Sequence, residues 1–272
     1  MRAALFALLL AVGTLVSAAV SSQAGEICTL VIDATSRQTI LERGDCTTPV
    51  TPASTFKVPL ALIGFDSGVL VDPHTPALAF QQGYADWVAE WRQDTDPARW
   101  MQYSVVWYSQ RIAHALGAER LTDYARAFDY GNADFSGDPG MDNGLDRAWI
   151  SSSLKVSPRD QAAFWFALLD RSLPVSPSAF ENTFAIIEGF SAAEGWTLRG
   201  KTGSAYPRNA DMSFDYDRDW GWFVGWAERD GERYVFVRLN QDNGPVQGSS
   251  GQRARNGFVA EWPNLISGLS GS

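Results

Sequence analysis

Strand patterns occur at both ends of this chain, and helical patterns fill the stretch between them. Apolar alternation predicts an N-terminal hairpin, and an Asp-Gly turn at 230–231 predicts a second hairpin near the C-terminus. A sheet built from both ends of a chain requires the middle to form a separate layer or an insertion. The predicted strands are 27–33, 37–42, 196–203, 220–228 and 234–240.

Helical periodicity covers most of the middle of the chain, where loops rich in Gly, Pro, Asp and Asn separate the segments. A further pattern over 251–268 predicts a closing helix that Pro263 bends or shortens. We therefore predict an α+β fold, with an antiparallel sheet built from both termini, flanking helices and an all-helical insertion. The predicted helices of the middle are 55–68, 84–93, 102–116, 119–129, 158–171 and 177–188.

The first 24 residues have the composition of an export signal. Met1-Arg2 is positively charged, residues 3–20 are almost wholly apolar, and Ser22-Gln23-Ala24 offers small residues for cleavage. We predict a signal peptide over 1–24 and a periplasmic protein, with no membrane contact after cleavage; a membrane anchor is the alternative. The rest is predicted as one unit, 25–272, with an α/β part over 25–52 and 190–272 and a helical part over 53–189.

Charge and the supply of metal ligands exclude several classes of protein. The 272 residues carry 22 Lys and Arg against 31 Asp and Glu, a net charge of −9 without a basic run, so no nucleic-acid partner is expected. The two cysteines and two histidines are scattered along the chain, at 28, 46, 74 and 114, so no zinc site built from them alone, and no other metal, is expected. In an oxidising compartment Cys28 and Cys46 are expected to form a disulfide, the alternative being two free buried thiols.

The chain has three lysines among its 22 cations, and two of them lie in motifs that suit nucleophilic catalysis. Ser54 and Lys57 are three residues apart at the start of a predicted helix, so they share one face. A serine hydroxyl needs a base, and a lysine becomes one when burial lowers its pKa. The same spacing recurs at Ser152 and Lys155, but that lysine falls outside a regular helix and is expected at the surface.

Lys201-Thr202-Gly203 follows a predicted strand. A lysine and a hydroxyl at the end of a strand suit the binding of a carboxylate, and the strand N–H groups after them suit polarisation of a carbonyl. The alternative is an ordinary edge-strand end. Ser104 and Asn132, taken alone, are equally well read as a helix cap and a turn residue.

In their order along the chain, these motifs resemble the class D (oxacillinase-type) serine β-lactamases. The resemblance spans nearly all of 25–272 and implies the fold that serine β-lactamases share with penicillin-binding proteins. Related penicillin-interactive proteins also have the first and the fifth of the matching segments, whereas the third and the fourth favour class D. The matching segments are 52–57, 104–106, 130–132, 149–157, 201–203 and 221–226.

The resemblance implies hydrolysis of a small β-lactam through an acyl-enzyme on Ser54. Lys57 is expected to carry a carbamate made from CO2 as the general base, and no other cofactor is expected. A neutral amine requires an apolar pocket. The Trp149 indole N–H is expected to donate to the carbamate. The expected pocket residues are Phe56, Val106, Trp149 and Ile150.

The remaining roles also follow from the resemblance. Ser104 relays a proton to the leaving nitrogen, and Lys201 supplies positive charge beside it. The backbone N–H groups of Ser54 and Ser204 form the oxyanion hole. Thr202, Gly203 and an arginine are expected to bind the substrate. We favour Arg253 for this role, with Arg255 as the alternative. The non-functional interpretation of Arg253 is a surface salt bridge.

Four other functions remain open from the sequence. A class A β-lactamase is disfavoured because that class has a Ser-Asp-Asn element, whereas this chain has Ser104-Val105-Val106. A class C β-lactamase is disfavoured because the chains of that class are considerably longer. A penicillin-binding D,D-peptidase has the same nucleophile but deacylates slowly. A β-lactam sensor domain acylates and stays acylated. The 11 tryptophans suggest a sugar-binding module, although core packing explains them better.

Overall fold

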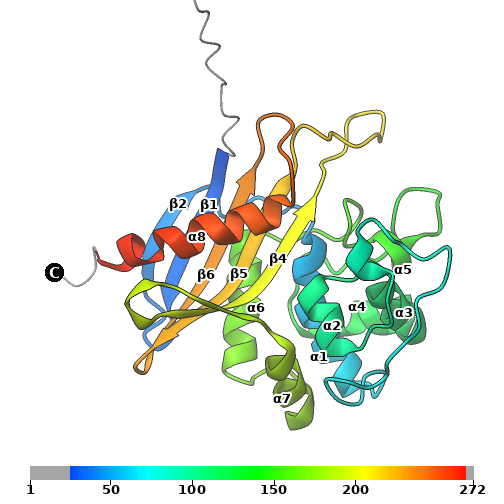
Figure 1. Ribbon diagram of the computed structural model, residues 1–272, viewed down its shortest axis with the longest axis horizontal. Coiled ribbons are helices and arrows are strands. Elements are labelled where there is room, and N and C mark those ends of the chain that lie inside the picture. The colour runs from blue at the N-terminus through cyan, green and yellow to red at the C-terminus, as the bar shows by residue number, and fades with distance from the viewer. Residues whose placement is uncertain (1–24, 268–272) are drawn as a thin grey trace, which may run out of the picture.

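The computed structural model describes residues 25–267, so the predicted signal peptide at 1–24 lies outside the described residues. Strands from both ends of the chain form one six-stranded antiparallel sheet in the order β2-β1-β6-β5-β4-β3 (Figure 1). This arrangement confirms the predicted α+β class and the shared sheet. The strands are β1 (Gly25–Asp33), β2 (Thr39–Gly44), β3 (Gly189–Ser191), β4 (Thr197–Ala205), β5 (Trp220–Arg229) and β6 (Glu232–Gln241).

Helices cover both faces of the sheet and form a block beside it (Figure 1). α8 packs on β4, β5 and β6, while α6 packs on the opposite face against β6, β5 and β1. The helices are α1 (Lys57–Asp66), α2 (Pro97–Tyr103), α3 (Val106–Leu116), α4 (Ala118–Ala127), α5 (Gly144–Arg147), α6 (Pro158–Leu169), α7 (Pro177–Ile186) and α8 (Ser250–Ser267), with 3-10 turns η1 (Ala53–Phe56), η2 (Ala89–Trp91) and η3 (Ala193–Gly195).

One predicted helix is wrong, and a second is interrupted near its start. The segment 84–93 contains only η2, because the helix begins later, where the Asp96 side chain caps the Arg99 N–H and Pro97 occupies the first turn. The segment 102–116 is broken at Ser104, which has a left-handed φ of 57°. In addition, α8 continues through Pro263 to its end, and the short β3 and α5 were not predicted.

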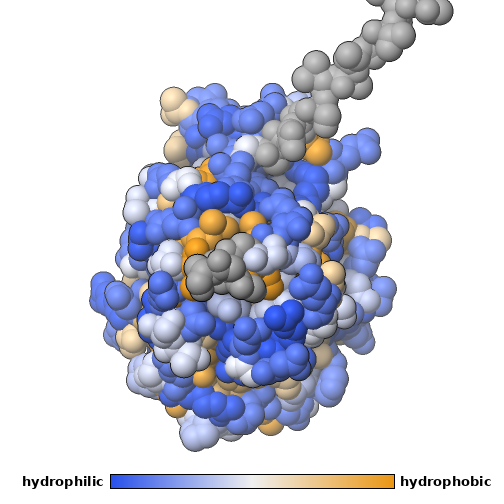
Figure 2. All heavy atoms as spheres, turned by 90° about the vertical axis from the view of Figure 1, so that its left-hand side faces the viewer, coloured by the Kyte–Doolittle hydropathy of each residue, from blue (hydrophilic) through white to orange (hydrophobic). Residues whose placement is uncertain are grey.

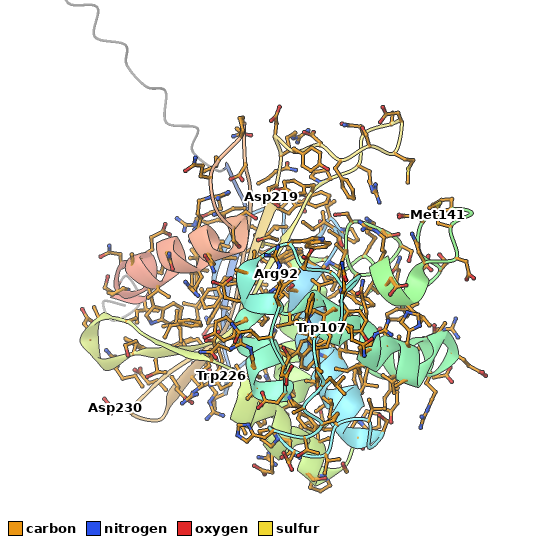
Figure 3. All side chains as sticks on the ribbon, turned by 45° about the vertical axis from the view of Figure 1, so that its right-hand side comes forward. Arg92, Trp107, Met141, Asp219, Trp226 and Asp230 are labelled. Atoms are coloured by element: carbon orange, nitrogen blue, oxygen red, sulfur yellow. A yellow bond between two sulfur atoms is a disulfide. The ribbon has the colours of Figure 1, made fainter. Side chains whose placement is uncertain are left out.

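The protein packs two hydrophobic clusters, one on each face of the sheet. Under α8, Phe236 lies 4.7 Å from Phe258, between ring centroids. On the other face Trp226 lies 5.7 Å from Trp165 of α6, at the junction of the sheet with the helices (Figure 3). Nine of the 11 tryptophans are buried, which confirms the core-packing interpretation: Trp91, Trp100, Trp107, Trp149, Trp165, Trp196, Trp222, Trp226 and Trp262.

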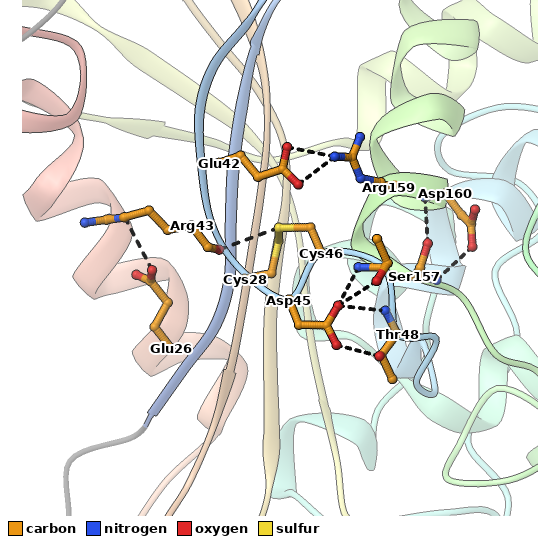
Figure 4. Close-up of a disulfide and its surroundings, with 11 residues drawn as sticks. Glu26, Cys28, Glu42, Arg43, Asp45, Cys46, Thr48, Ser157, Arg159 and Asp160 are labelled. Carbon is orange, nitrogen blue, oxygen red and sulfur yellow. Dashed lines mark hydrogen bonds and ion pairs between the residues drawn. A yellow bond between two sulfur atoms is a disulfide. The ribbon is translucent and has the colours of Figure 1, made fainter.

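A disulfide joins Cys28 on β1 to Cys46 just beyond β2, as predicted (Figure 4). Beside it, Arg159 at the start of α6 donates to both carboxylate oxygens of Glu42, at 2.7 and 2.8 Å. These two links fix the chain where it leaves the sheet. The next segment, 47–54, therefore enters the helical block from an anchored point.

The surface at the left of Figure 1 is mainly hydrophilic, with apolar residues gathered near the end of the described chain (Figure 2). Among residues 25–267, no helix combines the length and the apolar character that a bilayer crossing requires.

Candidate active site

Ser54 lies on a tight turn that three neighbours hold in place. The turn is η1, so the regular helix starts at Lys57 and not at Ser54 as predicted. The Thr55 hydroxyl donates to the Pro52 carbonyl at 2.7 Å, and buried Gln161 on α6 donates to the same hydroxyl at 2.7 Å. Gly203 on β4 allows close approach, since a Cβ there would lie 2.9 Å from the Pro52 oxygen. The turn is therefore fixed from both sides.

Lys57 is buried directly behind Ser54, with its Nζ 3.4 Å from the Ser54 Oγ. Burial lowers the pKa of Lys57 well below its usual value, and the charge of Lys201 lowers it further. Burial therefore favours the neutral form of the amine. Among the expected pocket residues, Phe56 stacks on Trp149 with 5.5 Å between ring centroids. Of the same set, Phe56, Val106 and Trp149 are buried and Ile150 is half-buried.

The segment that carries Trp149 is tied to the residue before the nucleophile turn. The Thr51 hydroxyl donates to the Trp149 carbonyl at 2.8 Å and accepts from the Ser151 N–H at 3.0 Å. The Trp222 indole N–H donates to the Thr51 carbonyl at 2.9 Å. Thr51 was not predicted, and as a buried threonine beside a proline it carries no distinctive sequence signal.

Ser104 joins α2 to α3 in a conformation that serine rarely adopts. Its φ of 57° and ψ of 38° are left-handed, and its buried hydroxyl has no hydrogen-bond partner among the described residues. Backbone strain and an unpaired buried hydroxyl both cost stability, and both are characteristic of functional positions. The hydroxyl is free to exchange a proton with a bound molecule.

Lys201 lies on β4, where its ammonium donates to the Thr202 carbonyl at 3.2 Å. Burial lowers the pKa of Lys201 to about 8; Glu188 opposes this change, while Arg255 adds to it. Burial also raises the pKa of Glu188. Glu188 was not predicted, because nothing in the sequence separates it from a surface acid at the end of a helix.

One cavity of about 470 Å³ brings most of the predicted residues together. One side of it has an apolar rim that contains Trp87, 61% exposed, and Tyr103, 38% exposed. The predicted residues that line the cavity are Ser54, Ser104, Val106, Ile150, Lys201, Thr202, Gly203 and Ser204.

The structure places the two candidate arginines differently. Arg253 does not line the cavity, because its guanidinium pairs with the buried Asp242 carboxylate and donates to the Gln247 and Gly248 carbonyls. Arg255, the alternative, lines the cavity from α8 and lies 4.7 Å from the Phe190 ring. Arg253 does lie nearer the preceding loop, as the prediction assumed. That loop supplies the Gln247 and Gly248 carbonyls to which the Arg253 guanidinium donates.

The Tyr130-Gly131-Asn132 motif has a structural role. Asn132 accepts from the Lys155 N–H at 2.9 Å through its side chain, and its own N–H donates to the Lys155 carbonyl at 3.0 Å. Gly131 has a φ of 58°, and a Cβ there would lie 2.0 Å from the Lys155 oxygen. The motif therefore fixes the segment that follows Trp149. Lys155 itself is half-buried, which corrects its expected place at the surface.

Comparison with known proteins places this geometry among described families. Residues 16–262 match the penicillin-binding protein transpeptidase domain, a range that includes every cavity residue. The β-lactamase OXA-9 of Klebsiella pneumoniae is 40% identical over 240 residues, 88% of each chain. The β-lactamase OXA-1 of Escherichia coli is 38% identical over 216 residues, 78% of this chain and 75% of the relative. The solved structure of the OXA-427 class D β-lactamase has a TM-score of 0.81 and 45% identity, covering 89% of this chain and 99% of that one.

Proposed function

This chain belongs to the class D β-lactamases, and we propose that it opens the β-lactam amide of penicillin-type antibiotics through an acyl-enzyme on Ser54, with N-carboxylated Lys57 as the general base. The observation that carries the proposal is the buried Lys57 amine 3.4 Å from the Ser54 hydroxyl. A buried amine of lowered pKa is the form that reacts with CO2.

The surroundings of Lys57 fit a carbamate. The amine is buried, the adjacent Phe56 ring stacks on the buried Trp149 ring, and the indole N–H of Trp149 is a donor only. A carbamate on Lys57 would supply an anionic oxygen that accepts a proton at neutral pH. Apart from this carbamate, the protein contacts to the substrate in the next two paragraphs come from unmodified residues of this chain.

Ser54 attacks the β-lactam carbonyl carbon as its Oγ–H proton passes to the base at Lys57. The C–N bond of the ring then breaks, leaving an ester on Ser54. Ser104 donates its hydroxyl proton to the leaving nitrogen, and the Lys201 ammonium compensates negative charge at Ser104. The proton taken from Ser54 would then pass to Ser104, which restores both Ser104 and the base. In the second half a proton of water would pass to the base as the water oxygen attacks the ester, and this proton would return to the Ser54 oxygen as the ester C–O bond breaks.

The backbone N–H groups of Ser54 and Ser204 are proposed as the oxyanion hole, in which each donor is worth about 2.7–4 kcal/mol in comparable sites. Both residues line the cavity. Arg255 and Thr202 are proposed to bind the substrate carboxylate, and Gly203 lets β4 approach the acyl group. The apolar rim at Trp87 and Tyr103 suits an aromatic or aliphatic side chain on the antibiotic.

The test is nitrocefin hydrolysis with and without added bicarbonate, at pH 7 and pH 5. We expect turnover that bicarbonate stimulates and that acid abolishes. Loss of turnover in Lys57→Ala supports the assigned base, and retained turnover contradicts it. Stable acylation of Ser54 without turnover would favour a penicillin-binding D,D-peptidase or a non-hydrolytic sensor, which the transpeptidase match also accommodates.

Export to the periplasm by residues 1–24 remains a proposal that rests on their composition. N-terminal sequencing of protein recovered from the periplasm should give a chain that starts at Gly25. A mature protein that begins at Met1 would contradict it.

A further inference from the structure

A second cavity, of about 540 Å³, lies on the other side of the Trp149 segment. Ile150 lines the active-site cavity, and its neighbour Ser151 lines the second one. The second cavity is lined further by residues from the loop after β4, and by Trp220 and Gln241, which pair across β5 and β6. It is thus a separate hollow that shares one wall with the active site.

Positive charge predominates in this second cavity, although the chain as a whole carries −9. Lys155, Arg208 and Arg218 line it, against one lining carboxylate, Asp45. The oxygens of Asp45 are already occupied by Thr47 and Thr48 of its own turn, at 2.5–3.1 Å. The lining side chains therefore carry three positive charges against one negative charge, and Asp138, which pairs with Arg208, lies outside the lining set.

The two arginines are held in place by protein acceptors. Arg208 donates to the Ser151 carbonyl at 3.1 Å and to the Asp138 carboxylate at 3.0 Å. Arg218 donates to the Gln241 side chain at 2.8 Å. Each guanidinium has five N–H donors, so both keep further N–H groups for a ligand. Oriented guanidinium groups lose little conformational entropy when they bind an anion.

Lys155 is the cation without a protein partner. Its main chain is fixed on both sides by Asn132, yet its ammonium has no ion pair or hydrogen bond with any residue in the described part of the chain. The negative charge of Asp138 acts on Lys155 and raises its pKa. The Asp138 carboxylate, however, already accepts hydrogen bonds from Ser152 and Arg208. The ammonium of this half-buried side chain is therefore open to an acceptor that enters the cavity from solution.

We propose that this cavity binds a small oxyanion, of the size of inorganic phosphate or an organic carboxylate, with the Lys155 ammonium as the principal donor and Arg208 and Arg218 as supporting donors. Charge-assisted hydrogen bonds to oxyanions are the strongest contacts that such a donor set forms. The bound anion would lie beside the Arg208 guanidinium, across the segment whose Ile150 lines the active-site cavity. This site gives Lys155 a role that catalysis does not require.

The test is a titration of the purified protein with sodium phosphate, and separately with sodium acetate, at constant ionic strength set by sodium chloride. The unfolding midpoint and isothermal calorimetry both report binding, because an anion that binds only the folded state stabilises it. We expect a saturable rise with at least one of the two anions. Saturation by acetate alone would assign the site to carboxylates, and by phosphate alone to inorganic oxyanions.

Lys155→Met should weaken the binding constant by roughly tenfold or more, as the loss of a charge-assisted contact implies. Arg126→Met is the matched control, because it also removes one cation, from an exposed position on α4. Equal binding by Lys155→Met and the unaltered protein, or no saturable binding by the latter, would overturn the proposal.

Arg218→Gln, which should also weaken binding, provides the same decision if Lys155→Met fails to fold. Nitrocefin turnover measured on the same samples tests the proposed hydrolysis separately, since the anion titrations contain no substrate.

Discussion

The Thr51 hydroxyl donates to the Trp149 carbonyl at 2.8 Å, although the two residues are 98 positions apart in sequence. Thr51 directly precedes Pro52, the residue at the N-cap of the turn that carries Ser54. Trp149 packs on Phe56 beside the Lys57 amine. One hydroxyl therefore links the nucleophile turn to the wall of the lysine pocket.

Thr51→Val should weaken both stability and deacylation. The substitution keeps the shape but leaves the Trp149 carbonyl and the Ser151 N–H without their partner, which costs about 1–3 kcal/mol for each buried group. Urea unfolding measures the first effect, and the ratio of burst to steady-state nitrocefin turnover measures the second. Thr51→Ser keeps the hydroxyl and should behave like the unaltered protein; equal losses in both variants would contradict this role.

Lys57→Met should stabilise the protein while abolishing turnover, and the stabilisation should depend on pH. The pKa of Lys57 is lowered in the folded state, so between that pKa and 10.5 the unfolded chain holds a proton that the folded protein lacks. The free energy of unfolding of the unaltered protein therefore rises with pH in this window, by up to about 1.4 kcal/mol per pH unit. Urea unfolding in bicarbonate-free buffer should show the largest gain for Lys57→Met at neutral pH and a shrinking gain toward pH 10. A gain that is constant with pH would exclude this cause.

The kcat/KM for penicillins should fall as pH rises through about 8, because Lys201 then loses the proton that gives it its charge. Glu188 favours the charged form of Lys201, so Glu188→Gln should move this basic limb to lower pH. Initial rates at substrate concentrations well below KM, measured over a series of pH values, give the basic limb of the unaltered protein and of Glu188→Gln. Glu188→Asp keeps the carboxylate and is the control. An unmoved basic limb in Glu188→Gln would show that the carboxylate does not support Lys201.

Arg255→Ala should raise the KM for penicillins by about tenfold with a smaller change in kcat, as expected when a charge-assisted bond to the substrate carboxylate is lost. Arg253→Ala is the matched control, because it removes the same side chain two positions earlier. It leaves buried Asp242 unpaired and should lower stability with little effect on KM. The reverse pattern in the two variants would restore Arg253 as the substrate ligand.

Cys28→Ser with Cys46→Ser should lower the free energy of unfolding by about 3 kcal/mol, since the bond closes a loop of 18 residues. The nitrocefin kcat at low temperature should remain near that of the unaltered protein, because the bond lies outside the cavity. Thermal unfolding with and without reductant measures the effect, and the double-serine variant should be insensitive to reductant.

The sequence was sufficient to predict the sheet of both termini, because strand alternation and the Asp-Gly turn are local signals. It also located Ser54, Ser104 and Lys201, whose residue types are dictated by the chemistry. It did not predict the break at Ser104, since a left-handed serine is imposed by tertiary packing and not by local preference.

The residues that position the site were also missed. Thr51 and Gln161 act through hydrogen bonds to groups about 100 positions away, and no periodicity records such partners. The choice between Arg253 and Arg255 depended on which of them meets Asp242, and that contact exists only once β6 and α8 are in place. Sequence spacing can place a residue on a helix or strand, but it cannot predict which of two nearby arginines forms an ion pair with another part of the chain.

The pairing of β1 with β6 brings residues 25–33 against 234–241, so the sheet is completed only when nearly the whole chain has been synthesised. Gly203 of β4 contacts the nucleophile turn in the assembled sheet, and it is in this assembled state that Lys57 is buried and its pKa is lowered. Contacts of such long range form late in folding. A nascent or truncated chain that lacks β6 would thus hold every residue of the motifs and still be unable to react, because reactivity here is acquired with the last strand.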